Sequence, residues 1–164
     1  MKNPEAYAHG EIDREIVLTR VVDAPAQACF QAWSDSKTLL QWFGPRGFTC
    51  EAIEHGQAQP GAVWRFVMIG PDGHRWGNRL EFVEVIPAER IVFHHGADED
   101  DDPNRFFVTI LFMPQDNGKT VVTLRQLHPT KARRDQGIGF GAVELGYQTL
   151  DKLAAYAKAH AHAG

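Results

Sequence analysis

Alternating apolar and polar residues dominate the middle of the chain, over residues 48–128. Alternate positions of a strand lie on one face of a sheet, so this pattern predicts about six strands with one apolar face. A turn is predicted at 71–73 (Pro-Asp-Gly) and a hairpin at 117–118 (Asn-Gly), and connections this short favour antiparallel pairing. Residues 15–23 are rich in β-branched side chains and predict one earlier strand.

The same alternation assigns side chains to the inner face of the sheet. The expected inner residues are Ala62, Trp64, Phe66, Met68, Ile91, Phe93, His95, Phe106, Val108, Ile110, Phe112, Val122, Leu124, Gln126 and His128. Arg65 alternates with Trp64 and is therefore expected on the surface.

Two short helices are predicted between the first strand and the others. Pro25 suits the first turn of a helix, and Cys29, Phe30 and Trp33 give that helix one apolar face. Ser36 is expected to cap the second helix, in which Leu39, Trp42 and Phe43 share a face. The pair 44–45 (Gly-Pro) ends it.

Apolar residues at spacings of three and four predict a long amphipathic helix over 137–163. An apolar sheet face must be covered, and this helix is the only large element left to cover it. The pattern therefore predicts an α+β fold in which an antiparallel sheet packs on a long C-terminal helix. Residues 1–13 are polar and patternless and are expected to form a flexible lead-in to a single domain over 14–164.

Five segments appear in an order that resembles that of a known superfamily. They are 23–25 (Asp-Ala-Pro), 40–45 (Leu-Gln-Trp-Phe-Gly-Pro), 61–68 (Gly-Ala-Val-Trp-Arg-Phe-Val-Met), 87–93 (Pro-Ala-Glu-Arg-Ile-Val-Phe) and 146–153 (Gly-Tyr-Gln-Thr-Leu-Asp-Lys-Leu). From about residue 15 to about residue 159 the chain resembles the START-like, or Bet v 1-like (SRPBCC), superfamily. Within it the chain is most similar to the branch named after the activator of the heat-shock protein 90 (Hsp90) ATPase. The resemblance implies a helix-grip fold, a curved sheet wrapped around a long helix with a pocket between them.

Composition and charge exclude some classes of function. A net charge of −4 at pH 7 argues against general nucleic-acid binding, which needs a basic surface. No apolar run approaches the roughly 20 residues of a membrane span, and residues 1–10 lack the apolar core of a signal peptide. The two cysteines, Cys29 and Cys50, form no disulfide framework and are expected to stay reduced in a cytoplasmic protein.

Aromatic residues from several elements are expected to converge inside the fold, together with a few polar ones. Ligand pockets have this composition, although buried aromatic residues also simply fill a core. The candidate ligand-binding residues are Trp33, Trp42, Trp64, Phe66, Trp76, Phe93, His95, Phe106, Phe112, Gln126, His128, Phe140 and Tyr147. Asn78 is a further polar candidate, and a pocket histidine can orient a ligand or act as a general base.

Other motifs carry little chemistry. His94 and His95 are adjacent on a strand and therefore point to opposite faces, so we expect no metal site formed by them and the acidic run 98–102. The acidic run itself is interpreted as a solvated, mobile loop. Residues 118–120 (Gly-Lys-Thr) lack the earlier glycine of a phosphate loop. The glycines of 137–141 are interpreted as a loosened helix start, with Phe140 in a lid. No cofactor and no activated nucleophile are expected.

Three functions remain open. The first is binding of a small hydrophobic or aromatic molecule between the sheet and the C-terminal helix. The second is an enzyme on the same fold, of the cyclase, dehydratase or hydrolase type, as the resemblance implies for some relatives. The third is a module that modulates a chaperone ATPase; because only a short segment precedes the first strand, we expect no additional N-terminal domain and place this role last. Apolar outer-face residues such as Leu111 would allow a weak homodimer.

Overall fold

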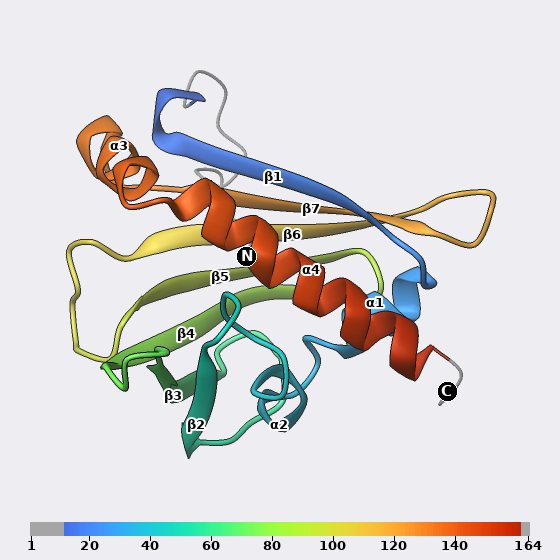
Figure 1. The fold of residues 1–164 in the computed structure, drawn as a ribbon, viewed down its shortest axis with the longest axis horizontal. Coiled ribbons are helices and arrows are strands. Elements are labelled where there is room, and N and C mark those ends of the chain that lie inside the picture. The colour runs from blue at the N-terminus through green and yellow to red at the C-terminus, as the bar shows by residue number, and fades with distance from the viewer. Residues whose placement is uncertain (1–11, 162–164) are drawn as a thin grey trace.

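The computed structural model describes residues 12–161, and its main element is a seven-stranded antiparallel sheet (Figure 1). Almost all of the predicted lead-in, residues 1–11, lies outside the described residues. The strand order is β1-β7-β6-β5-β4-β3-β2. The strands are β1 (Glu15–Val22), β2 (Thr49–Glu54), β3 (Val63–Ile69), β4 (Arg75–Ile86), β5 (Arg90–Ala97), β6 (Phe106–Pro114) and β7 (Thr120–Leu127).

The sheet is a meander from β2 to β7 that ends by pairing β7 with β1. The α-helices of the protein are α1 (Ala26–Gln31), α2 (Ser36–Leu39), α3 (Lys131–Gly139) and α4 (Ala142–His160). Figure 1 shows α4 crossing the concave face of the curved sheet, with α1 and α2 near one end and α3 at the other. The α+β helix-grip arrangement predicted for the chain is confirmed. Within the described part of the chain, no helix is long and apolar enough to cross a bilayer.

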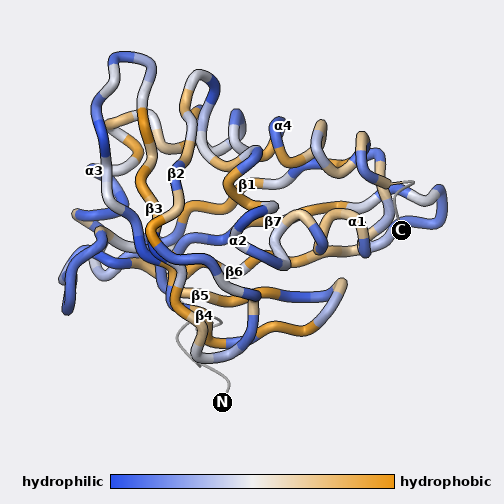
Figure 2. The backbone as a smooth tube through the Cα atoms, turned by 90° about the horizontal axis from the view of Figure 1, so that it is seen from below, coloured by the Kyte–Doolittle hydropathy of each residue, from blue (hydrophilic) through white to orange (hydrophobic). Residues whose placement is uncertain are grey.

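The core lies between α4 and the inner face of the sheet. Trp64, Phe66, Phe93 and Ile110 alternate along their strands and are buried, as predicted. From α4, Leu150, Leu153 and Ala157 are buried against them. Figure 2 shows the apolar residues gathered in the strands and the polar ones at the turns. Burial of apolar surface at about 25 cal/mol per Å² is the main force that holds these two layers together.

The two short helices begin where the sequence predicts but end earlier than predicted. Helix α1 ends at Gln31 and α2 at Leu39, so Trp33, Trp42 and Phe43 lie beyond the helix ends. Pro25 is the N-cap of α1 and has an extended backbone. The N-cap of α2 is Asp35 rather than Ser36, because the Asp35 Oδ1 accepts a hydrogen bond from the Thr38 backbone N–H at 3.1 Å. Ser36 is the first helical residue, and its buried hydroxyl lies 3.1 Å from His55 Nδ1 and accepts from the Gly56 N–H.

The C-terminal helical region was predicted as one helix and is two. Helix α3 is capped by Thr130, whose hydroxyl accepts from the Arg133 N–H at 3.1 Å. Gly141, with φ 90°, then turns the chain before α4 begins at Ala142. No residue of α3 is buried, so its sequence carries no apolar stripe to reveal it. Of the predicted range, residues 162 and 163 lie outside the described residues.

The acidic loop is anchored, and the prediction of a solvated loop is wrong for two of its residues. The Asp98 carboxylate accepts hydrogen bonds from Arg65 at 2.8 Å and from Arg79 at 3.1 Å. Asp102 is buried and accepts from the backbone N–H groups of Ala97 and Asn104, each at 2.9 Å. The loop is therefore tied to the outer face of the sheet and to the end of β5.

Candidate functional site

A recess with two connected parts lies between the sheet and the N-terminal half of α4. The inner chamber, about 170 Å³, is lined by Trp33, Phe43, Gly44, Pro45, Met68, Phe93, His95, Phe106, Val108, Leu124, Gln126, Ala142, Leu145, Gly146 and Thr149. The outer chamber, about 570 Å³, is lined by Pro45, Phe48, Met68, Trp76, Gly77, Asn78, His95, Gly96, Ala97, Glu99, Asp102, Asn104, Phe106, Arg133 and Leu145. The lining residues common to both chambers show that they adjoin.

The walls of the inner chamber are mainly apolar. Trp33 and Phe93 pack with their ring centroids 5.7 Å apart, and Val108 and Leu124 come from the neighbouring strands β6 and β7. Helix α4 contributes small residues here, because Ala142, Gly146 and Thr149 recur at spacings of three and four. Small side chains on the helix face leave space that larger ones would fill.

His95 is the main polar group between the two chambers. The Asn78 amide nitrogen donates to the Trp76 carbonyl at 3.0 Å, which turns Asn78 Oδ1 toward His95 Nε2 at 2.8 Å. Because an amide oxygen only accepts, Nε2 carries the proton and Nδ1 is left as an acceptor. Burial lowers the pKa of His95 to about 4, against the opposing charge of Asp102, so its ring is neutral at pH 7.

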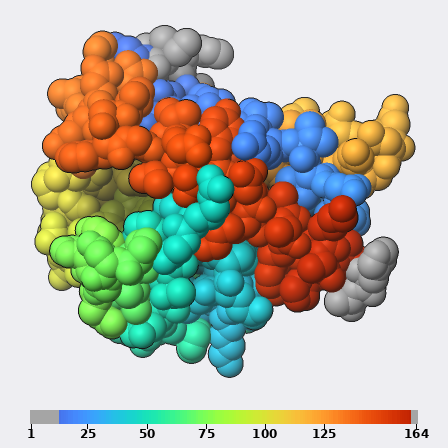
Figure 3. Space-filling view, viewed as in Figure 1, coloured from blue at the N-terminus to red at the C-terminus, as the bar shows by residue number. Residues whose placement is uncertain are grey.

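The outer chamber has a more varied wall and opens to solvent. Trp76 is half-exposed and packs on Phe48 with ring centroids 5.7 Å apart. Arg133 of α3, Asp102 and Glu99 add charge. Figure 3 shows a hollow on this face, between α3 in orange and the turn that joins β3 and β4 in green.

The structure brings six of the predicted site residues to this recess. Trp33, Phe93, His95, Phe106 and Gln126 line the inner chamber, and Trp76 lines the outer one. His128 lines neither chamber: its ring stacks on Phe106 with centroids 4.8 Å apart, and it lines a second depression instead.

The other predicted site residues lie elsewhere. Trp42, Trp64, Phe66 and Phe112 are buried in the core, where the indole N–H groups of Trp42 and Trp64 donate to the carbonyls of Ala32 and Gln57. The Tyr147 ring lies under the Arg20 guanidinium, 4.4 Å from its centroid. Phe140 is 76% exposed. None of these six side chains lines either chamber.

Sequence reasoning missed Phe43, Pro45, Leu145 and Arg133 as lining residues. Phe43 was assigned to a helix face and not to a pocket. Leu145 lies on the α4 face of Ala142, Gly146 and Thr149, and this stripe of small residues was the available signal. Arg133 belongs to α3, which the pattern did not predict; Thr130 as a cap, with Lys131 and Asp135 four residues apart, was the signal there.

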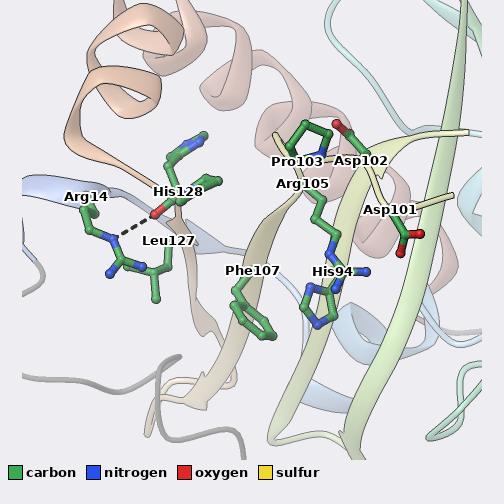
Figure 4. Close-up of a pocket in the computed structure, with 10 residues that line it drawn as sticks. Arg14, His94, Asp101, Asp102, Pro103, Arg105, Phe107, Leu127 and His128 are labelled. Atoms are coloured by element: carbon green, nitrogen blue, oxygen red, sulfur yellow. Dashed lines mark hydrogen bonds between the residues drawn. The ribbon is translucent and has the colours of Figure 1, made fainter. Parts of the chain in front are cut away.

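A second depression of about 400 Å³ lies at the end of the sheet where β5, β6 and β7 meet the acidic loop (Figure 4). His94, Phe107 and Leu127 are cross-strand neighbours on the outer face and form its floor. Both of its arginines have partners: Arg14 donates to the His128 carbonyl at 2.9 Å, and Arg105 lies 3.4 Å from Glu81. These pairs make it a weaker candidate than the recess under α4.

Other reactive groups in the described part of the chain offer no second site. No three or more His, Cys, Asp and Glu side chains among residues 12–161 are grouped so as to hold a metal ion. Cys29 and Cys50 are free thiols. Burial raises the pKa of each to about 11, so neither is a thiolate nucleophile at pH 7.

Comparison with known proteins identifies the family and supports the fold. The family model described as "Activator of Hsp90 ATPase homolog 1-like protein" matches residues 23–158. No curated protein matches the chain significantly. Among solved structures, a protein from Arthrobacter aurescens superposes with a TM-score of 0.81 at 16% identity, covering 92% of this chain and 90% of its own.

Two further solved structures are similar over most of both chains. One, from Mycobacterium smegmatis, has a TM-score of 0.76 at 21% identity and covers 90% of this chain and 93% of its own. The other is an activator-of-Hsp90-ATPase-homolog protein from Silicibacter pomeroyi, with a TM-score of 0.70 at 26% identity, covering 86% and 95%. Below 25% identity such a likeness shows a shared fold only.

Proposed function

The chain belongs to the family of activator of Hsp90 ATPase homolog 1-like proteins, and we propose that it binds a small hydrophobic or aromatic molecule in the recess between the sheet and α4. The observation that carries this proposal is the lining of the recess. Its inner walls are apolar and aromatic, and one neutral hydrogen-bonded pair, His95 and Asn78, lies between its two chambers. Pockets for small organic ligands combine these features.

The two chambers suit different parts of one ligand. An apolar or aromatic body fits the inner chamber, where it would contact Trp33, Phe93 and Leu124. The His95 Nδ1 atom accepts a hydrogen bond, so a hydroxyl or N–H group of the ligand can be held there. The part of the ligand that extends into the outer chamber can stack on the half-exposed indole ring of Trp76.

The same geometry favours binding over catalysis. A general base works best when its pKa lies near the working pH, and burial lowers the pKa of His95 to about 4. The partner of the ring is an amide, Asn78, and not a carboxylate that would raise its basicity. A chaperone-modulating role would rest on the family's description alone.

A fluorescence titration with the neutral probe N-phenyl-1-naphthylamine tests the proposal. We expect saturable binding to the wild-type protein with one site per chain. Leu145 and Val143 are similarly exposed on the first turns of α4, but only Leu145 lines the recess. Leu145→Trp should fill the recess and weaken binding at least about tenfold, whereas Val143→Trp should leave it unchanged. Equal affinity in the two folded variants would reject the recess as the binding site.

A further inference from the structure

Three buried polar atoms under α3 have no hydrogen-bond partner among the described residues. They are Nδ1 and Nε2 of His128 and Nε of Arg133. Buried polar groups in native proteins almost always have partners, because leaving one unpaired costs its lost solvation. Two such residues side by side, next to a recess, mark a place where a ligand group can complete the hydrogen bonds.

His128 is held rigidly at the end of β7. Its backbone N–H donates to the Arg14 carbonyl, and its carbonyl accepts from Arg14 Nε, each at 2.9 Å. Figure 4 shows the imidazole ring turned away from Arg14. The ring is only 7% exposed and stacks on Phe106, which lines both chambers of the recess.

Arg133 brings a positive charge to the same place. Its backbone N–H is fixed by the Thr130 cap in the first turn of α3, and its side chain lines the outer chamber. Burial, followed by the charges of Arg133 and Arg134, lowers the pKa of His128 to about 4, so the ring is neutral and does not compete for an anion. One nitrogen of a neutral imidazole is a donor, as is Arg133 Nε.

The charge of Arg133 is not neutralised within the described residues, because no carboxylate lies within ion-pair distance of it. Its neighbours Lys131 and Arg134 both pair with Asp135. Asp102, on the opposite wall of the chamber, already accepts two backbone hydrogen bonds. Arg133 instead contacts Gln136, an uncharged side chain, through Nη1.

We propose that the ligand of this recess is an amphipathic carboxylic acid, whose carboxylate binds Arg133 beside His128 while its apolar body occupies the chambers. A carboxylate supplies acceptor oxygens for both donors and the missing negative charge, and Arg binds carboxylates with favourable geometry. This inference rests on the function proposed above and adds the class of ligand.

A pair of probes with the same aromatic body tests the inference. We would titrate 2-naphthylacetic acid and 2-(2-naphthyl)ethanol into the wild-type protein at pH 7.5 by calorimetry. The acid should bind at least about tenfold more tightly than the alcohol. Arg133→Gln should abolish this preference by weakening binding of the acid at least about tenfold. Lys131→Gln removes the same charge from the same helix outside the recess and should keep the preference.

The outcomes separate this inference from the proposed function. Binding of the alcohol with no preference for the acid, or an acid preference that survives Arg133→Gln, overturns the carboxylate site and leaves the recess as a ligand site. Binding of neither probe overturns both. As a second variant, His128→Leu keeps the net charge at pH 7 but removes the imidazole donor, and it should reduce the acid preference about threefold or more.

Discussion

Helix α4 approaches the sheet so closely at Gly146 that a Cβ atom at this position would lie 2.3 Å from Cδ1 of the buried Leu18. Gly146→Ala therefore forces the Leu18 side chain out of its position in the core. Overpacking of this kind lowers the free energy of unfolding by about 1–3 kcal/mol. The higher helix propensity of alanine offsets up to about 1 kcal/mol of this loss. We expect a net loss on the order of 1 kcal/mol in the free energy of unfolding, measured by urea denaturation.

The control for this prediction is an identical substitution without the close contact. A Cβ at Gly137, inside α3, would meet other atoms only at 3.8 Å or more, so Gly137→Ala should be neutral or stabilising. The Leu18→Val variant lacks the Cδ1 methyl group that makes this contact. In that background, Gly146→Ala should no longer lower the free energy of unfolding. If Gly146→Ala is still destabilising in the Leu18→Val background, the contact with Leu18 is not the reason that position 146 requires glycine.

The strands were predictable because each depends on a local pattern. The alternation over residues 48–128 and the turn at 71–73 predicted two strands on either side of that turn, where β3 and β4 lie. Burial of Trp64, Phe66 and Phe93 followed from the same alternation. Helix α3 could not be found this way, because it buries no residue and so has no periodic apolar signal.

The choice between core and cavity could not be made from the sequence. Leu145 and Tyr147 are two positions apart and point about 200° apart around the helix. The docking of α4 on the sheet decides that Leu145 faces the recess while Tyr147 packs under Arg20. Likewise, Trp33 and Trp42 pack against each other, yet only Trp33 lines the inner chamber. These outcomes depend on tertiary contacts that no local pattern encodes.

The acidic loop gives a second prediction. Asp98 is almost buried and bonds two arginines, so removal of its carboxylate leaves Arg65 and Arg79 without their shared partner. Asp98→Ala should lower the free energy of unfolding by about 1–3 kcal/mol, as expected for a charged hydrogen-bonded group. Asp100 is 90% exposed and bonds Arg79 alone, and Asp100→Ala should change stability by less than about 1 kcal/mol. Equal effects in thermal or urea unfolding would contradict the anchoring role of Asp98.

Lys152 links α4 to the rim of the recess and gives a third prediction. Its ammonium group lies 3.3 Å from the Pro45 carbonyl and 3.4 Å from that of Phe48, and burial lowers its pKa. Lys152→Met keeps the apolar stem but leaves both carbonyls without this donor. We expect a loss of about 1–2 kcal/mol in urea unfolding. Lys158→Met, on the exposed part of α4, is the matched control and should have little effect.

The last prediction concerns pH. Burial lowers the pKa of both His95 and His128 to about 4, whereas an imidazole in the unfolded chain has a pKa of about 6.5. Above about pH 6.5 both histidines are neutral in both states, so their contribution to stability is fully present. Between about pH 6.5 and 4 the unfolded chain binds protons that the native protein does not, so stability falls as the pH falls.

One pKa unit corresponds to about 1.4 kcal/mol, so each histidine should lower the free energy of unfolding by on the order of 2–3 kcal/mol by pH 4. Urea midpoints measured from pH 7 to pH 4.5 would record this slope. Carboxylates also titrate there, so the informative quantity is the difference between wild type and His128→Phe, which should have a shallower slope. A His128→Phe slope equal to that of wild type would mean that this ring is not held neutral by burial.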